Sequence, residues 1–326
     1  MAFDAEEKFE ELRERISDLK ETAEERGIDM SDQIRELRDR LESEREQAYE
    51  DLSRYDRVKL ARDQDRPFTL DYVEHLFDDW VELHGDRRYG DDGAIVGGWA
   101  TFRGRSVMVI GQQRGRDMEE NLKRNFGSPH PEGYRKAGRL MELAEKFGKP
   151  VITMVDTQGA YPGIGAEERG QAEAIAANLK RMAGLRTPLV TCVIGEGGSG
   201  GALGIAVADR VLMMENAIYS VISPEGCAAI LWRSRDEAGK AAEALKVTAP
   251  DLLELGVIDE IVPEPGGGAH ADPEAAAGAL DQVLGDHLEE VADRDPEELV
   301  EERREKFYAM GAWEEKEPPD GARLDR

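Results

Sequence analysis

The sequence predicts an α/β protein in which helices cover both faces of a mostly parallel sheet, with a helical arm before this domain and a charged, helical tail after it. Short, almost wholly apolar segments such as 151–155 and 189–194 alternate with helical segments, which is typical of parallel sheets buried on both faces. Apolar residues concentrate between about Ile95 and Val262, whereas both ends are strongly charged. A chain of 326 residues with 40% hydrophobic residues is long enough for one large domain plus accessory pieces.

Residues 1–57 are predicted to form a helical arm. The segment 5–57 is rich in Glu, Arg, Lys, Leu and Ile, and it contains no Pro. Apolar residues recur there at spacings of three and four, as expected for two amphipathic helices broken near Gly27 to Ser31. They are Phe9, Leu12, Ile16, Leu19, Ile34, Leu37 and Leu41. Such a narrow apolar stripe favours packing on a neighbouring domain or subunit, and the alternative is a solvated arm.

Residues 58–292 are predicted to form the α/β domain, because apolar runs there are separated by glycine- and proline-rich turns. The expected strands are 94–102, 106–112, 151–155, 189–194, 211–215, 217–221 and 257–262. The expected helices are 71–83, 132–147, 166–183, 199–208, 224–232, 241–255 and 273–292. Helix 132–147 has a clear stop, since Gly148 follows it and Pro150 lies just beyond.

The last segment, 293–326, is predicted to be a charged tail. A Pro/Gly linker, PEPGGG, separates the final strand from helix 273–292. Beyond that helix nearly every residue is charged, with Phe307 and Trp313 as isolated anchors. The final dozen residues are expected to fray.

The charge balance excludes some classes of partner. The formal net charge is -27, from 70 acidic and 43 basic residues. Such a field repels nucleic acid and anionic membranes, and it fits poorly with an anionic substrate. Because the excess is spread along the whole chain, adaptation to a saline cytoplasm is one interpretation, and an ordinary acidic cytosolic protein is the other.

Two cysteines, Cys192 and Cys227, form no disulfide framework, and neither lies in a CxxC pair or near a histidine cluster. We therefore expect no metal site in this chain. The first ten residues are acidic and resemble no signal peptide, and no run of 18 apolar residues occurs. The protein is expected to be soluble and cytoplasmic.

Two glycine-rich turns follow consecutive predicted strands, 156–163 (DTQGAYPG) and 195–202 (GEGGSGGA). In the second turn, N–H groups at a helix start lack intrahelical partners, and the missing side chains at Gly197, Gly198, Gly200 and Gly201 let an oxygen approach closely. With the helix dipole, this arrangement suits an oxyanion or another anion. The alternatives are tight helix–strand packing and a phosphate cradle.

Known glycine motifs fit the second turn poorly. No Gly-Lys-Ser/Thr follows it, and the GxGxxG dinucleotide motif fits only loosely because no acidic ribose partner lies at the expected distance. The segment 197–201 matches G-x-S-x-G, but none of the five histidines lies in the apolar strand–helix region where a triad base is expected.

Longer motifs carry a family resemblance: RPFTLDYV, RNFGSPHPEGYRKA, DTQGAYPG followed by AEERGQAEAIA, GEGGSGGA and YSVISPEGCAAILW. From about Asp56 to Pro273 the chain resembles the alpha subunit of the heteromeric acetyl-CoA carboxylase carboxyltransferase. The resemblance implies a crotonase-like fold, a twisted ββα superhelix. It also implies an α2β2 assembly in which a beta subunit supplies a zinc-binding domain and most of the acetyl-CoA site.

The implied reaction converts acetyl-CoA and carboxybiotin to malonyl-CoA and biotin, the committed step of fatty acid synthesis. The resemblance implies that the carboxybiotin is presented by a biotin carboxyl carrier protein, with biotin carboxylase in the larger complex. Self-sufficient biotin-dependent decarboxylases or carboxylases share the two-turn pattern but are generally longer. A non-catalytic scaffold is the other alternative.

Site residues follow from the same resemblance. Gly200 and Gly201 correspond to the backbone donors for the biotin ureido oxygen. The pocket around them would be shaped by Gly159, Ala160, Gly163, Gly197, Gly198 and Ala202. Gln158 stands where the family usually has Pro, which relaxes that turn. A basic patch of Arg116, Lys123 and Arg124 is expected either to contact CoA phosphates or to be ordinary surface charge.

Overall fold

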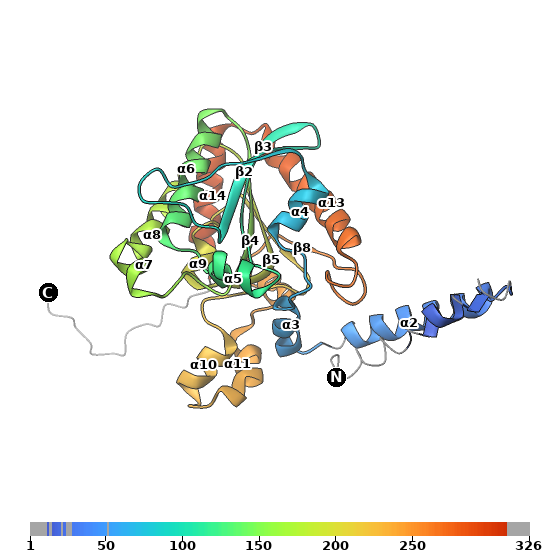
Figure 1. Ribbon diagram of the computed structural model, residues 1–326. Coiled ribbons are helices and arrows are strands. Elements are labelled where there is room, and N and C mark those ends of the chain that lie inside the picture. The colour runs from blue at the N-terminus through green and yellow to red at the C-terminus, as the bar shows by residue number, and fades with distance from the viewer. Residues whose placement is uncertain (1–11, 13–14, 21, 24–27, 51, 312–326) are drawn as a thin grey trace, which may run out of the picture.

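The computed structural model describes residues 12, 15–20, 22–23, 28–50 and 52–311. In this part of the chain, eight strands form one sheet with the order β1-β2-β3-β4-β5-β6-β8, and β7 pairs with the far end of β5 (Figure 1). The strands are β1 Asp78–Glu82, β2 Ile95–Phe102, β3 Arg105–Gln112, β4 Val151–Thr157, β5 Leu189–Gly198, β6 Arg210–Met214, β7 Ile218–Ser220 and β8 Glu260–Val262. β1, β2 and β3 pair antiparallel, and every pairing after β3 is parallel.

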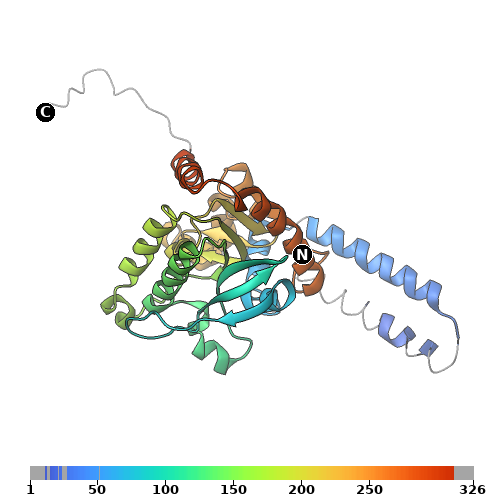
Figure 2. The ribbon, with the colours of Figure 1, turned by 90° about the horizontal axis from the view of Figure 1, so that it is seen from above.

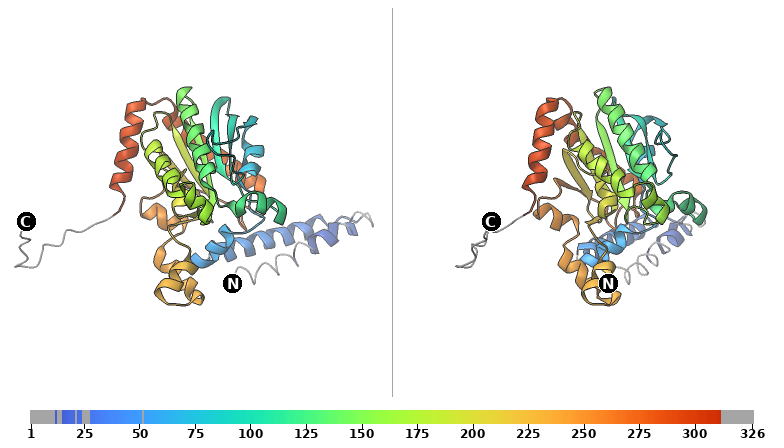
Figure 3. Two further views of the ribbon diagram at one scale, coloured as in Figure 1. Left: turned by 60° about the vertical axis from the view of Figure 1, so that its left-hand side comes forward. Right: turned by 90° about the vertical axis from the view of Figure 1, so that its left-hand side faces the viewer.

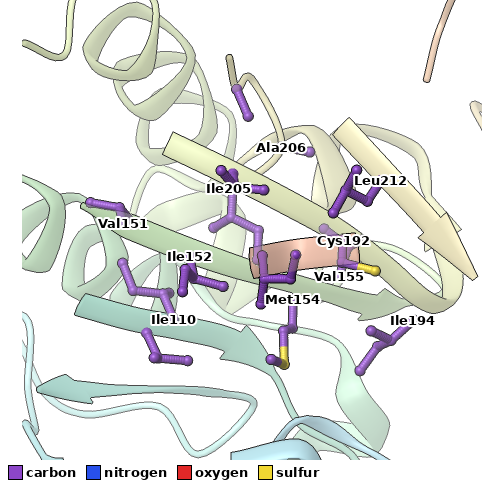
Figure 4. Packing of buried hydrophobic residues seen from close by; sticks show 14 of the residues in the cluster. Ile110, Val151, Ile152, Met154, Val155, Cys192, Ile194, Ile205, Ala206 and Leu212 are labelled. Atoms are coloured by element: carbon purple, nitrogen blue, oxygen red, sulfur yellow. The ribbon is translucent and has the colours of Figure 1, made fainter. Parts of the chain in front are cut away.

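Helices cover both faces of the sheet, as the sequence predicts. α6 (Pro131–Lys146) and α8 (Gln171–Met182) lie on one side, and α4 (Thr69–Leu76) and α13 (Pro273–Ala292) lie on the other (Figures 1 and 3). The sheet is buried between them. All seven residues of β4 are buried, and their apolar side chains interleave with those of β3, β5 and β6 (Figure 4).

Short helices fill the connections: α5 Met118–Lys123, η1 Asn125–Gly127, α7 Ile164–Glu168, α9 Ser199–Leu203 and α12 Ala249–Glu254. α10 (Pro224–Leu231), η2 (Arg235–Glu237) and α11 (Ala238–Leu245) form a helical lobe that protrudes beneath the sheet (Figure 1). Three aliphatic side chains at the base and on the helices of this lobe are exposed: Val221, Ile230 and Leu231.

The arm consists of a long helix, α2 (Ser31–Glu50), which extends away from the body (Figure 2), and α3 (Arg54–Ala61), which packs against α11. Arg54 in α3 forms ion pairs with Glu243 and, at 2.6 Å, with Asp251. Most of the first predicted arm helix lies outside the described residues, although 15–20 and 22–23 are helical. The predicted boundary at residue 57 falls within α3, and the division into 1–57, 58–292 and 293–326 stays a prediction.

Some predicted helices are too long. The helix predicted at 71–83 ends at Leu76, because the next residues pair antiparallel with β2 as the edge strand β1. The helix predicted at 241–255 breaks at Lys246, which has a positive φ of 52°. The helix predicted at 166–183 divides at Gly170, where φ is 84°. Each break depends on a backbone conformation or a strand pairing that hydrophobic spacing does not show.

The predicted C-terminal tail is helical in its described part. Residues 296–309 form α14 (Pro296–Ala309), which packs on the α8 side of the molecule. Its Arg303 is buried and pairs with Asp209 at 2.8 Å, and Leu299 is buried as well. Phe307 packs against the core rather than standing as an isolated anchor. The final dozen residues lie outside the described part of the chain.

Candidate functional site

The two glycine-rich turns lie against each other at the carboxyl ends of the central strands β4 and β5. β4 and β5 are parallel neighbours, so their carboxyl ends meet there. A Cβ on Gly198 would lie 2.2 Å from the carbonyl oxygen of Gln158, and a Cβ on Gly201 would lie 2.5 Å from the amide nitrogen of Ala160. The glycines are therefore required for the contact between the turns.

The second turn differs from the prediction in its secondary structure. Residues 195–198, expected as part of the turn, continue strand β5 to Gly198. The following helix, α9, has only five residues and ends at Leu203 rather than at 208. Ser199 opens it with a positive φ of 55°, a sparsely populated conformation for a residue with a side chain.

Two N–H groups are left without acceptors at the start of α9. The first N–H groups of a helix have no intrahelical partner, and no other described group accepts from the N–H of Gly200 or of Gly201. Beside Gly200 the space is open, since a Cβ there would meet only Ile175, at 3.9 Å. The N–H of Gly200 can therefore donate to an external oxygen, whereas Gly201 is itself buried at the contact between the turns.

Three hollows surround this turn. An apolar hollow of about 280 Å³ is bordered by Ser199 and by residues such as Leu203, Tyr219 and Phe307. A polar hollow of about 540 Å³ lies on the other side, between Arg62, Arg114 and Glu225. A small cavity that includes Gly197, Gly198 and Ser199 lies between them and shares residues with both.

The polar hollow holds a compensated charge cluster. Arg62 pairs with Glu196 and with Glu225, each at 2.8 Å, and Arg114 lies 2.9 Å from the carboxylate of Asp156. Burial raises the pKa of Asp156, and the nearby Arg114 only partly offsets this effect. Burial also acts to raise the pKa of Glu225, but the hydrogen bonds that this carboxylate accepts and the charge of Arg62 together outweigh burial and lower that pKa. The arginines are thus largely neutralised by neighbouring carboxylates.

The structure brings together most of the predicted pocket residues. Gly159, Ala160, Gly198 and Gly201 form the contact between the turns. Gly197 lies within β5 and is paired with Thr157 of β4. The other two predicted residues take structural positions: Ala202 is fully buried, and Gly163 is the residue preceding α7, where a Cβ would lie 2.4 Å from the Tyr161 ring.

The predicted basic patch is divided and largely paired. Arg116 pairs with Asp71 and lies 4.0 Å over the Phe68 ring, and it borders a hollow of about 340 Å³ that adjoins the turns. Arg124 pairs with Glu120 at 2.8 Å. Lys123 is exposed at the end of α5. These three side chains do not form one cationic surface.

Two residues that the sequence did not predict, Gln112 and Tyr134, support the second turn through hydrogen bonds to its backbone. Gln112 ends β3 and donates from Nε2 to the carbonyl oxygen of Gly201 at 2.9 Å. The hydroxyl of Tyr134, in α6, donates to the same oxygen at 3.1 Å. A polar residue at the carboxyl end of an apolar strand is a usable signal for Gln112. No pattern marks Tyr134, which lies in an ordinary amphipathic helix.

The alternative of a serine nucleophile lacks a base. Ser199 borders the apolar hollow and the small cavity, and none of the described residues lining either of them is a histidine. Within the described ranges, no three His, Cys, Asp or Glu side chains come together as a metal-binding group. Among the described helices, none is long and apolar enough to cross a membrane.

Comparison with known proteins gives the family. A family model described as acetyl co-enzyme A carboxylase carboxyltransferase-like matches residues 2–311. The alpha subunit of acetyl-coenzyme A carboxylase carboxyl transferase from a strain of Thermus thermophilus is 59% identical over 305 residues, covering 94% of this chain and 96% of that protein. The same subunit from Shouchella clausii is 56% identical over 301 residues, with 92% and 93% coverage.

Solved structures with this fold include transcarboxylase 12S, a Pseudomonas malonate decarboxylase hetero-tetramer and the beta subunit of Pseudomonas aeruginosa geranyl-CoA carboxylase. Their TM-scores are 0.54, 0.55 and 0.53, at 22%, 18% and 16% identity. The matches cover 68%, 66% and 78% of this chain, and 43%, 86% and 45% of those chains. They confirm the crotonase-like carboxyltransferase fold. The family model and the relatives show that the chain belongs to the acetyl-CoA carboxylase carboxyltransferase alpha-subunit family, a family of transferases.

Proposed function

We propose that this chain, joined to a beta subunit, transfers the carboxyl group of carboxybiotin to acetyl-CoA and so forms malonyl-CoA for fatty acid synthesis. The observation that carries this proposal is the pair of N–H groups at Gly200 and Gly201, which have no described acceptor and lie where two glycine-rich turns meet. Family membership supplies the reaction class.

The residues present fit the ureido oxygen of a biotin ring. Backbone N–H groups that are fixed in place stabilise negative charge growing on an oxygen, and they favour the transition state over the ground state. Carboxybiotin would supply the carboxyl group and, after its loss, a ring nitrogen able to accept a proton. This chain's part is to bind and polarise the ring oxygen, with Gly159 and Ala160 forming one wall. Neither role requires a side-chain base.

The partners and setting are further parts of the proposal. They are an α2β2 assembly with a zinc-binding beta subunit, a biotin carboxyl carrier protein, and biotin carboxylase in the larger complex. We assign the enzyme to the cytoplasm, in a cell whose interior is saline. The relatives' subunit name and the hetero-tetrameric malonate decarboxylase support a partner chain. The net charge of -27 supports the saline setting.

Co-expression with candidate beta subunits, followed by an assay of malonyl-CoA formation, tests the proposal. The complex should form malonyl-CoA, and the chain alone should not. Robust activity of the chain alone would indicate a self-sufficient enzyme instead. Gly201→Val should abolish transfer while the purified complex still assembles, and unchanged activity would favour a scaffold.

A further inference from the structure

A carbonyl oxygen beneath the second turn is held by two buried side chains from other parts of the fold. α9 makes only one turn: Gly204 N donates to Gly200 O at 3.0 Å, but Ile205 N donates to Ala202 O at 3.2 Å rather than to Gly201 O. The carbonyl of Gly201 is thereby left without the backbone donor that a longer helix would provide. Gln112 and Tyr134 both donate to it, at 2.9 and 3.1 Å.

Gln112 is positioned so that both ends of its amide are used. It is fully buried, and its Oε1 accepts from the N–H of Asp156 at 3.0 Å while its Nε2 donates to Gly201. The two partners fix the orientation of the amide, since the backbone N–H requires an acceptor and the carbonyl requires a donor. Gln112 therefore ties the end of β4 to the start of α9.

Tyr134 is also fully buried. Its ring packs directly against Gly204, since a Cβ on Gly204 would lie 2.7 Å from two ring carbons. Burial raises the pKa of Tyr134 well above its ordinary value, so the hydroxyl stays protonated and remains a donor. Asn178 of α8 adds support, because its Nδ2 donates to the carbonyls of Tyr134 and Gly204 at 2.8 and 3.1 Å. The second turn is thus held from β3, α6 and α8.

We propose that Gln112 and Tyr134 are positioning residues that hold the Gly201 carbonyl, and through it the orientation of the neighbouring N–H donors, for carboxyl transfer. The inference rests on the proposed function. Two adjacent glycines give this turn unusual backbone freedom, which would let its N–H groups point in several directions. Fixing the carbonyl from outside removes that freedom, and catalysis by preorganised donors depends on such fixed geometry.

The chain offers a matched control for each residue. Gln113, the neighbour of Gln112, is buried and also bridges two backbone groups, accepting from Leu70 N and donating to Arg114 O, each at 2.9 Å. Tyr72 is buried like Tyr134, but its hydroxyl has no described hydrogen-bond partner. Neither control residue contacts the second turn through these groups.

The experiment compares Gln112→Glu with Gln113→Glu, and Tyr134→Phe with Tyr72→Phe, in the complex with a beta subunit. Gln112→Glu places a carboxylate oxygen against the Gly201 carbonyl and should lower kcat for malonyl-CoA formation by about 100-fold. Tyr134→Phe leaves one donor and should lower kcat by about 3- to 10-fold. KM for acetyl-CoA should stay within about twofold, because the interaction lost is made in the transition state. The controls should keep kcat within about twofold.

Amide hydrogen exchange gives a readout that does not depend on the reaction. The hydrogen-bonded amides of Gly204 and Ile205 should exchange at least about tenfold faster in Gln112→Glu and Tyr134→Phe than in the controls. Equal exchange in all four variants, or equal loss of kcat in Gln112→Glu and Gln113→Glu, overturns the inference. A wild-type complex that forms no malonyl-CoA instead contradicts the proposed function, and the exchange rates still test the positioning. If Gln112→Glu does not fold, the comparison of kcat and amide exchange between Tyr134→Phe and Tyr72→Phe tests the inference.

Discussion

At the scale of single residues, the site depends on what adjacent glycines allow. Gly200 and Gly201 are neighbours, yet their surroundings differ: a Cβ on Gly201 would meet the backbone of Gly159 and Ala160 within 3 Å, whereas a Cβ on Gly200 would contact only Ile175. Backbone atoms cannot move aside as a flexible side chain can. Gly201 is therefore required for the contact between the turns, and Gly200 borders open space.

This contrast predicts different effects for two small substitutions. Gly201→Ala should push the turns apart and reduce carboxyl transfer by about 100-fold or more, comparable to the loss of an oxyanion donor. Gly200→Ala should leave the free energy of unfolding within about 1 kcal/mol of wild type, because nothing obstructs its Cβ. Urea denaturation of each chain and kcat of each complex measure these effects. Equal destabilisation by both would show that the turns are not packed as described.

A buried ion pair gives a second prediction at this scale. The side chain of Glu264 is fully buried, pairs with Arg66 at 2.8 Å and accepts from Ala269 N and Asn216 N. Burial favours its neutral form, but Arg66 and Asn216 outweigh burial and lower its pKa from 4.5 to about 2. The carboxylate therefore contributes stability that is fully present above about pH 4.5 and is lost as the pH falls towards 2.

Glu264→Gln should lower the free energy of unfolding near neutral pH by about 3–5 kcal/mol, because it leaves the Arg66 charge buried without a partner. The difference from wild type should narrow as the pH falls from about 4.5. Urea denaturation at several pH values measures it. Glu243→Gln, which removes the more exposed partner of Arg54, is the control and should cost less than about 1 kcal/mol. If the difference in unfolding free energy between wild type and Glu264→Gln stayed constant below pH 4.5, it would contradict the lowered pKa of Glu264.

At the scale of elements, Arg303 makes the buried polar contacts between α14 and the body, beside the apolar contacts of Leu299 and Phe307. Arg303 donates to the carbonyls of Leu185 and Thr187, at 2.9 and 3.3 Å, and forms two hydrogen bonds of 2.8 Å with Asp209. Asp209 is itself buried and accepts from the N–H of Leu189 at the start of β5. The last described helix thus binds the two segments that lead into β5 and β6.

Arg303→Ala should destabilise the protein by about 3–5 kcal/mol, because Asp209 would be left buried and unpaired. The neighbouring Arg304 makes one exposed hydrogen bond, to Ala183 O, so Arg304→Ala should cost less than about 0.5 kcal/mol. Thermal and urea denaturation of both variants provide the comparison. A cost for Arg303→Ala no greater than that for Arg304→Ala would show that α14 is only loosely attached.

The sequence predicted the fold better than the details that complete it. Strands β2 to β6 follow directly from apolar runs, since a strand buried on both faces needs no other residues. Helices or strands end at Lys246, Gly170 and Ser199 because these residues have a positive φ. In a sequence, only glycine indicates that conformation. The pair of turns was predicted because its glycines lie within two short segments. The contacts of Gln112 and Tyr134 with Gly201 could not be predicted from the sequence. These residues are 89 and 67 positions from Gly201, and only the folded structure brings them together.

At the scale of the whole molecule, charge is the dominant feature. The net charge of -27 acts against the compact state, although many arginines are paired with carboxylates, as in the polar hollow. Salt weakens long-range repulsion, because the Debye length falls from about 10 Å at 0.1 M to about 3 Å at 1 M. The buried pairs are screened much less. The protein should therefore gain stability from salt despite its many ion pairs.

Raising KCl from 0.1 to 1 M should increase Tm by about 2–5 °C, equivalent to about 1–2 kcal/mol at this size. Scanning calorimetry measures the shift. An equal osmolality of sucrose separates screening from exclusion effects, because sucrose carries no charge. A Tm that falls with KCl, or that rises equally with sucrose, would argue against relief of charge repulsion and against the saline setting.

The Arg303–Asp209 pair also has a consequence for the order in which the molecule can be completed during synthesis. Asp209 precedes Arg303 by 94 residues. At translation rates of about 5–20 residues per second, the carboxylate leaves the peptidyl-transferase centre roughly 5 to 20 s before its cation does. Over that interval the β5–β6 region carries an unpaired acid that the finished core buries. The sheet can therefore reach its final packing only when the C-terminal helix emerges, so a ribosome stalled before residue 303 would hold an incomplete core.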